Sequence, residues 1–283
     1  MERLGVIGGG VMGSGISEVG ARSGLDVITV EVDDDTAKAA RDRVEASLHH
    51  AQERGKLDAA AVEEALGRIT FTSDLDALAD RQLVVEAATE DEATKLDLFS
   101  RVGTILDADD AILASNTSAI PIVKLGAVSG RAELVMGVHF FNPAPIMKLV
   151  ELVPSLTTDP QTTERMKAFV TDDLGKQPIE ATDRAGFIVN SLLNPYLLSA
   201  IRMYEAGYAS AADIDRGMVL GCGHPMGPLA LADLIGLDTV QAIGASMYEE
   251  FKEPLYSPSP ILDRMVDAGL LGKKTGHGFY SYD

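Results

Sequence analysis

The sequence predicts an α/β fold, in which a doubly wound, mostly parallel sheet is followed by an all-helical domain. Three observations support this prediction. A short apolar run at residues 4–7 ends in three glycines, later apolar runs lack strict alternation, and the pattern becomes purely helical after about residue 184. The length of 283 residues suits two modest domains, which we expect over residues 1–183 and 184–283.

The first 32 residues predict a strand, a glycine turn, a helix and a second strand. Val11, Ile16 and Val19 recur at helical spacing until Gly24, and residues 26–32 are rich in β-branched side chains. A G-x-G-x-x-G motif therefore lies between a strand and a helix, as in Rossmann-type dinucleotide sites. We expect the pyrophosphate of a dinucleotide to lie against the turn residues Gly8, Gly10, Val11, Met12 and Gly13.

A carboxylate follows the second predicted strand, because Glu31 lies 18 residues after Gly13. An acid at this place can accept both hydroxyls of the adenosine ribose and repels a 2′-phosphate, so NAD is favoured over NADP. The alternative is a plain glycine turn followed by a solvated glutamate.

The remaining elements follow in order along the chain. Residues 35–66 predict two antiparallel helices with a break at Gly55, and residues 94–106 predict a further helix. Short apolar runs predict buried parallel strands at residues 83–87, 111–114 and 134–138, with sheet extensions at 148–153 and 178–180. The second domain predicts helices at residues 186–206, 211–220 behind a Ser210/Asp213 capping box, 229–251 with breaks at Gly236 and Gly244, and 260–268.

Composition limits the partners of this chain. A formal charge of −19 argues against nucleic acid or an anionic membrane as a partner, and any anionic ligand needs a local cationic patch. Apolar runs of 18 residues and a signal-peptide pattern are both missing from the sequence, so we expect a cytoplasmic protein. We expect the single cysteine, Cys222, to be a buried residue without reactivity, and we expect no metal site.

Polar side chains follow the predicted strands at one edge of the sheet. Ser115, Asn116, Thr117 and Ser118 come after one strand, and His139 ends the next. Glu151 lies within an apolar strand, where a buried carboxylate is costly unless it is paired. An imidazole on the adjacent strand is one partner and Lys148 is the alternative. A His139–Glu151 pair would suit proton abstraction from an alcohol during hydride transfer to nicotinamide.

These segments together resemble the L-3-hydroxyacyl-CoA dehydrogenase family. The resemblance rests on GGGVMGSGI, SNTS, HFFNPAPIMKLVE, AGFIVN, PMGPLALADLIGLD and KKTGHGFY, which span residues 3–281. The compact length is similar to that of the single-function 3-hydroxybutyryl-CoA dehydrogenases. The resemblance implies that His139 is the catalytic base, that Glu151 orients it, and that Ser118 and Asn190 bind the substrate oxygen in a cleft between the domains.

The resemblance also implies the ligand contacts. It assigns NAD contacts to Glu31, Glu90, Lys95, Asn116, Ser118, Asn142 and Lys274, and coenzyme A contacts to Ser47, Arg54 and Ser118. Without the family, Lys95 would be interpreted as a solvated helix charge and Lys273–Lys274 as a surface pair. Glu31 and Arg54 depart from the commoner aspartate and lysine of the family.

The resemblance implies an acyl-CoA substrate and a homodimer formed through the helical domain. Two alternatives remain open at this point. The chain could be a related dehydrogenase of a free hydroxy acid such as L-gulonate. It could also be a non-catalytic NAD-binding protein that keeps the fold.

Overall fold

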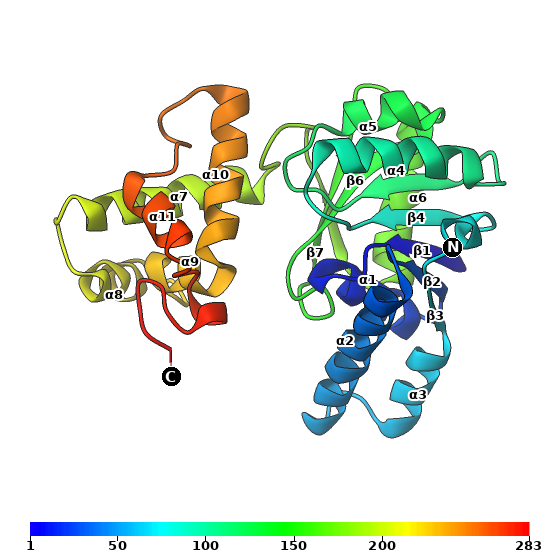
Figure 1. Ribbon diagram of the computed structural model, residues 1–283, viewed down its shortest axis with the longest axis horizontal. Coiled ribbons are helices and arrows are strands. Elements are labelled where there is room, and N and C mark those ends of the chain that lie inside the picture. Colours follow the sequence, from blue (N-terminus) through cyan, green and yellow to red (C-terminus); the bar gives the residue numbers. More distant parts are fainter. Residues whose placement is uncertain (283) are drawn as a thin grey trace. The chain divides into compact units, whose positions relative to one another are not determined.

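The computed structural model describes residues 1–282. These divide into two compact units, residues 1–183 and residues 184–282, each of which is described by itself (Figure 1). The first unit is an α/β domain and the second is helical, so the predicted fold class is confirmed.

The first unit is built on an eight-stranded sheet with the order β3-β2-β1-β4-β5-β6-β7-β8. All neighbouring strands are parallel except β6 and β7, which are antiparallel. The strands are β1 (Arg3–Ile7), β2 (Asp26–Val30), β3 (Ile69–Thr72), β4 (Leu83–Glu86), β5 (Ile112–Ser115), β6 (Val135–Phe140), β7 (Leu149–Pro154) and β8 (Gln177–Glu180). The sequence analysis missed β3, a strand of only four residues, although these are β-branched or aromatic and come two residues after Gly67.

The helices of this unit begin where short polar side chains can cap them. Asp33 forms a reciprocal capping box with Thr36, and Asp58, Asp91 and Asp159 each accept a backbone N–H of their own first turn. The helices are α1 (Val11–Arg22), α2 (Asp34–Glu53), α3 (Ala59–Gly67), α4 (Glu92–Ile105), α5 (Ile122–Ser129) and α6 (Pro160–Ala168). Figure 1 shows that α2 and α3 form a hairpin extending away from the sheet, as predicted for residues 35–66.

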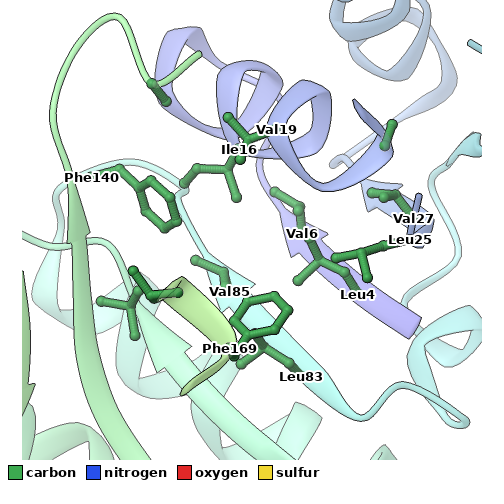
Figure 2. Packing of buried hydrophobic residues seen from close by; sticks show 14 of the residues in the cluster. Leu4, Val6, Ile16, Val19, Leu25, Val27, Leu83, Val85, Phe140 and Phe169 are labelled. Carbon is green, nitrogen blue, oxygen red and sulfur yellow. The ribbon is translucent and has the colours of Figure 1, made fainter. Parts of the chain in front are cut away.

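The core of this unit lies between α1 and the central strands. Val6 on β1 and Val85 on β4 pack with Ile16 on α1 and with Phe140 at the end of β6 (Figure 2). Residues of β4, β5 and β6 are buried throughout, because helices cover both faces of a parallel sheet. This packing fixes the carboxyl ends of the strands relative to α1.

In residues 184–282 the second unit contains five α-helices with their own core. They are α7 (Val189–Glu205), α8 (Ala211–Cys222), α9 (Pro228–Ile235), α10 (Leu237–Phe251) and α11 (Pro260–Asp267). Gly236 breaks the chain between α9 and α10 as predicted, but the predicted break at Gly244 is wrong because α10 runs through it. A Cβ at Gly244 would lie 3.0 Å from the carbonyl of Tyr256, so this glycine permits close packing.

Two smaller expectations about this unit also change. Ser210 caps α8 through the N–H of Asp213, but the Asp213 carboxylate accepts from the Ser210 hydroxyl rather than closing the box on the backbone. Cys222 is exposed rather than buried, because it ends α8 on the outer surface of the unit. Among the described residues, no single helix is long and apolar enough to span a membrane. Only α9 and α10 taken together reach the required length and hydropathy, and the two helices are bent by 96° relative to each other.

Two buried aspartates hold the end of the chain onto the second unit. Asp233 is fully buried and accepts the N–H groups of Phe279 and Tyr280 at 2.9 Å and the Tyr282 hydroxyl at 3.0 Å. Asp215 accepts the Tyr280 hydroxyl at 2.8 Å while it also caps the first turn of α9. We call residues 279–282 with these two aspartates the tail latch.

We expect the tail latch to weaken at alkaline pH. Burial and the hydrogen bond to Asp215 raise the pKa of Tyr280 well above its usual 10.0, and burial and Asp233 do the same for Tyr282. Below 10.0 both the folded and the unfolded chain keep these protons, so the contribution to stability is complete. Above it the unfolded chain releases them first, so the free energy of unfolding falls as pH rises.

Urea unfolding followed by circular dichroism across this pH range measures the effect. The double variant Tyr280→Phe/Tyr282→Phe should be less stable near neutral pH and should lose part of the alkaline decline. Tyr208→Phe is the matched control, because the Tyr208 side chain is 80% exposed. An unchanged alkaline slope in the double variant would contradict the role of these two hydroxyls.

Candidate active site

The carboxyl ends of the parallel strands bring the candidate residues of the first unit to one edge of the sheet. The register pairs Ile7 of β1 with Glu86 of β4, and Glu86 in turn with Ser115 of β5. The strand order reverses direction between β1 and β4, and open α/β sheets bind ligands at such a switch point. The residues after β1, β2, β4, β5 and β6 therefore gather at this edge.

The glycine turn after β1 is shaped for a pyrophosphate. Gly8 has φ of +88°, and a Cβ at Gly13 would lie 1.7 Å from the Gly8 carbonyl oxygen, so both positions require glycine. A Cβ at Gly10 would meet no described atom within 4 Å, so open space lies over the turn. Because α1 begins at Val11 with no side-chain cap and no acid in its first turn, its first N–H groups can bind phosphate there. Met12, half-buried, packs on the core.

Glu31 lies one residue beyond β2 and contacts this turn. Its Oε1 accepts the Gly9 N–H at 2.6 Å, which fixes the carboxylate beside the space over Gly10. The half-buried Glu31 side chain has a second carboxylate oxygen, Oε2, that can accept hydrogen bonds from other donors. This geometry fits the ribose of NAD, whose two hydroxyls are donors.

A buried ion pair links β4 and α4 just below the sheet edge. Lys95 Nζ lies 2.6 Å from Glu86 Oε1 and 3.3 Å from Glu90 Oε2. Glu86 is 0% exposed and Lys95 1% exposed, so the interpretation of Lys95 as a solvated charge is wrong. The remaining Glu86 acceptors are satisfied by the Ser115 hydroxyl at 2.6 Å and the Ala88 N–H at 2.7 Å.

The segment after β5 is held by the same network. Glu90 accepts the Thr117 hydroxyl at 2.5 Å and the Ser118 N–H at 3.1 Å. Asn116 accepts the Phe140 N–H at 2.8 Å, which ties this segment to the end of β6. The half-buried Ser118 is therefore placed by its backbone and by its neighbours.

His139 and Glu151 form a direct contact across the antiparallel pair β6 and β7. They are register partners, and His139 Nδ1 lies 2.8 Å from Glu151 Oε2. Glu151 is 0% exposed and His139 8% exposed, whereas Lys148, the alternative partner, is exposed. The Glu151 carboxylate at Nδ1 fixes the orientation and the tautomer of the ring. The other ring nitrogen, Nε2, therefore lies on the side of the ring away from Glu151.

A buried lysine anchors the loop between these two strands. Lys176 Nζ donates to the carbonyls of Ala144 and Met147 at 2.7 Å, and burial lowers the pKa of its ammonium. Asn142, which is exposed, begins this loop with a cis peptide bond to Pro143. The anchored loop packs on α1, where a Cβ at Gly15 would lie 3.0 Å from Ala144.

Two of the predicted coenzyme A residues lie on α2 or at its end, whereas the third, Ser118, follows β5. The Ser47 hydroxyl donates to Glu18 of α1 at 2.5 Å, and Glu18 also holds Arg22 at 3.0 Å. Arg54 caps the end of α2 and is exposed, as is the neighbouring Lys56. These exposed cations at the end of α2 supply the local positive charge that such an acidic protein needs to bind an anionic ligand.

Two predicted site residues lie in the second unit. Asn190 is half-buried in the first turn of α7. Lys274 forms an ion pair with Asp238 of α10, with both Nζ to oxygen distances at 2.6 Å. Their roles as substrate and NAD contacts stay predictions.

Family models match both units. The NAD-binding domain model of 3-hydroxyacyl-CoA dehydrogenase matches residues 3–184, and the C-terminal domain model of the same family matches residues 186–282. The chain belongs to the 3-hydroxyacyl-CoA dehydrogenase family. It is therefore an NAD-dependent oxidoreductase, and the predicted resemblance, enzyme class and cofactor are confirmed.

Relatives of the 3-hydroxyacyl-CoA dehydrogenase family cover the whole chain. A 3-hydroxybutyryl-CoA dehydrogenase of Mycobacterium tuberculosis is 52% identical over 100% of this chain and 99% of its own. The crystal structure of M. tuberculosis FadB2 has a TM-score of 0.99 at 52% identity, covering 100% of this chain and 99% of that chain. The (S)-3-hydroxybutyryl-CoA dehydrogenase PaaH1 of Ralstonia eutropha has a TM-score of 0.93 at 42% identity, with the same coverage.

The sequence analysis missed three side chains that shape this dehydrogenase site: Glu86, Lys176 and Arg43. Glu86 had a usable signal, because it ends an apolar strand as a carboxylate that needs a partner. Lys176 and Arg43 had none, because their partners are backbone carbonyls far away in the sequence, Ala144 and Met147 for Lys176 and Gly9 for Arg43.

Proposed function

We propose that this dehydrogenase interconverts L-3-hydroxyacyl-CoA and 3-ketoacyl-CoA thioesters, with 3-hydroxybutyryl-CoA and acetoacetyl-CoA as its substrates. The observation that carries the proposal is the contact of 2.8 Å between His139 Nδ1 and Glu151 Oε2 at the sheet edge that bears the glycine turn. Full-length similarity to 3-hydroxybutyryl-CoA dehydrogenases supports the short acyl chain.

His139 is the general base in the oxidation direction. Its Nε2 takes the proton of the 3-hydroxyl group as the C3–O bond becomes a carbonyl, and Glu151 stabilises the imidazolium that forms. Bound NAD supplies the acceptor for the hydride that leaves C3. In the reduction direction, the His139 imidazolium returns its proton to the same oxygen.

Ser118 and Asn190 donate hydrogen bonds to the substrate oxygen, where negative charge develops. Donors that are held in place before the reaction stabilise such charge without reorganisation. The Ser118 backbone is held by Glu90, and Asn190 lies in the first turn of α7. We assign NAD contacts to the glycine turn, Glu31, Glu90, Lys95, Asn116, Ser118, Asn142 and Lys274, and coenzyme A contacts to Ser47, Arg54 and Ser118.

An NADH-oxidation assay tests this function. We expect turnover of acetoacetyl-CoA with NADH, slower turnover of longer 3-ketoacyl-CoA thioesters, and little turnover with NADPH because Glu31 repels a 2′-phosphate. Faster oxidation of L-gulonate with NAD than of 3-hydroxybutyryl-CoA would assign the chain to free hydroxy acids. NADH binding without turnover of any 3-ketoacyl-CoA would support a non-catalytic role.

The second unit forms a cytoplasmic homodimer in this proposal. Leu192 and Leu220 are 73% and 71% exposed, and a second copy of the chain would cover these apolar side chains. Light scattering at micromolar concentration should give twice the mass of 30.0 kDa. A monomeric mass would refute the dimer without affecting the proposed chemistry.

A further inference from the structure

An arginine on α2 reaches back to the glycine turn of the dinucleotide site. The Arg43 guanidinium donates from Nη1 to the carbonyl oxygen of Gly9, between the glycines of the motif. Helix α2 lies directly against this turn, because a Cβ at Gly9 would lie 2.3 Å from the Cβ of Ala40, one turn before Arg43. The contact fixes a cation over the part of the turn that the strands position for a dinucleotide.

The Arg43 guanidinium differs from neighbouring cations in its partner. Arg41 on the same helix pairs with Glu45 at 3.2 Å, and Arg22 pairs with Glu18 at 3.0 Å. In residues 1–282, no carboxylate oxygen lies within 4.0 Å of Arg43. A guanidinium has five N–H donors, so this exposed side chain keeps donors for a ligand after its contact with Gly9.

The charges around the turn make such a cation important. Glu31 lies on the Gly9 N–H at 2.6 Å, and Glu18 is buried on α1 a little further along. The chain as a whole carries −19, so its mean field opposes the approach of a dianionic pyrophosphate. The partial positive charge of the α1 N-terminus attracts the pyrophosphate and so opposes this repulsion. The full positive charge of Arg43 strengthens that attraction.

We infer that Arg43 is a cofactor-binding residue whose guanidinium, held on the Gly9 carbonyl, donates to the pyrophosphate of NAD. This inference rests on the NAD site at the glycine turn and adds a phosphate contact to it from α2. Coenzyme A also carries a diphosphate, and Ser47 lies one turn after Arg43. The partner carbonyl belongs to the dinucleotide turn, which favours the dinucleotide as the source of the phosphates.

Arg43→Ala tests the inference, with Arg41→Ala as the matched control of equal charge change on the same helix. NADH binding is measured by nucleotide fluorescence without substrate. We expect the NADH dissociation constant of Arg43→Ala to rise about five- to tenfold, since charge-assisted hydrogen bonds are the stronger ones. The kcat at saturating NADH should stay within about twofold of wild type, because uniform binding changes only the KM. Arg41→Ala should bind NADH as wild type does.

Competition by ADP and by adenosine separates a phosphate contact from a change in the turn itself. Only ADP carries a diphosphate, so its affinity should fall in Arg43→Ala while that of adenosine stays unchanged. The NADH affinity of Arg43→Ala should also depend less on salt than that of wild type, because one screened charge pair is missing. Arg43→Lys keeps the charge but lacks the planar guanidinium, so its NADH affinity should lie between those of wild type and Arg43→Ala. This variant also tests the contact if Arg43→Ala folds poorly.

Several results would overturn the inference. These are an unchanged NADH dissociation constant in Arg43→Ala, an equal loss of ADP and adenosine affinity, or a raised KM for acetoacetyl-CoA at unchanged NADH affinity, which would assign the contact to coenzyme A. Failure of the wild-type chain to bind NADH would instead count against the NAD site, so the two failures are distinguishable.

Discussion

We expect His139→Gln to lower kcat by about 10²–10⁴, the usual contribution of a positioned general acid or base. Glutamine can fill much of the same space but cannot take up a proton at neutral pH. NADH affinity should change little, because the glycine turn follows β1 and Glu31 follows β2, whereas His139 lies on β6. Steady-state kinetics with acetoacetyl-CoA and a fluorescence titration with NADH measure the two effects separately.

Glu151→Gln is the second test of the same pair. It leaves a polar group of equal size against Nδ1 but removes the negative charge that stabilises the imidazolium, so kcat should fall while NADH still binds. His49→Gln on the exposed surface of α2 is the matched control and should have wild-type activity.

Equal losses of turnover and NADH affinity in His139→Gln would point to misfolding and would contradict the assignment of the base.

The second large effect is expected from Lys95→Met, which should lower the free energy of unfolding by about 3 kcal/mol, at the lower end of the range for breaking a buried ion pair. Methionine can fill the space of the lysine stem, but the Glu86 carboxylate then stays buried without its cation. The Ser115 hydroxyl and the Ala88 N–H still bind that carboxylate and limit the loss.

Urea unfolding measures this effect and can assign it to the correct unit. All seven tyrosines lie between residues 196 and 282, so tyrosine fluorescence follows the second unit while circular dichroism follows both. We expect the dichroism midpoint to fall more than the fluorescence midpoint. Glu86→Gln/Lys95→Met should regain much of the stability, because it removes both buried charges.

Lys124→Met is the matched control, since it breaks the exposed ion pair with Glu92 and should have little effect. An unchanged unfolding midpoint in Lys95→Met would contradict the importance of the buried pair. A double variant no more stable than Lys95→Met would show that burial of the Glu86 charge is not the cause.

The contact between His139 and Glu151 could be predicted from the sequence because burial leaves few options for a carboxylate. Glu151 lies in an apolar strand, and an antiparallel return from β6 brings it beside His139. The same reasoning applied to Glu86 at the end of β4 would have predicted a buried cation. It would have identified Lys95, nine residues later, as that partner rather than as a solvated charge.

Contacts to backbone carbonyls could not be predicted in this way. Every residue offers a carbonyl, so neither charge nor hydropathy identifies Gly9 as the partner of Arg43 or Ala144 as a partner of Lys176. The break expected at Gly244 failed for a related reason. A glycine occupies this position because the Tyr256 backbone packs closely against it, and periodicity along the helix does not reveal such a contact.

The tail latch makes the last few described residues part of the structure rather than an appendage. Asp233 is completely enclosed, and three of its hydrogen-bond donors come from residues 279–282. Truncation before Phe279 would strand that carboxylate in an apolar interior, where an uncompensated charge is unfavourable. A fusion partner attached at this end would therefore need a spacer beyond Tyr282 to leave the helical unit intact.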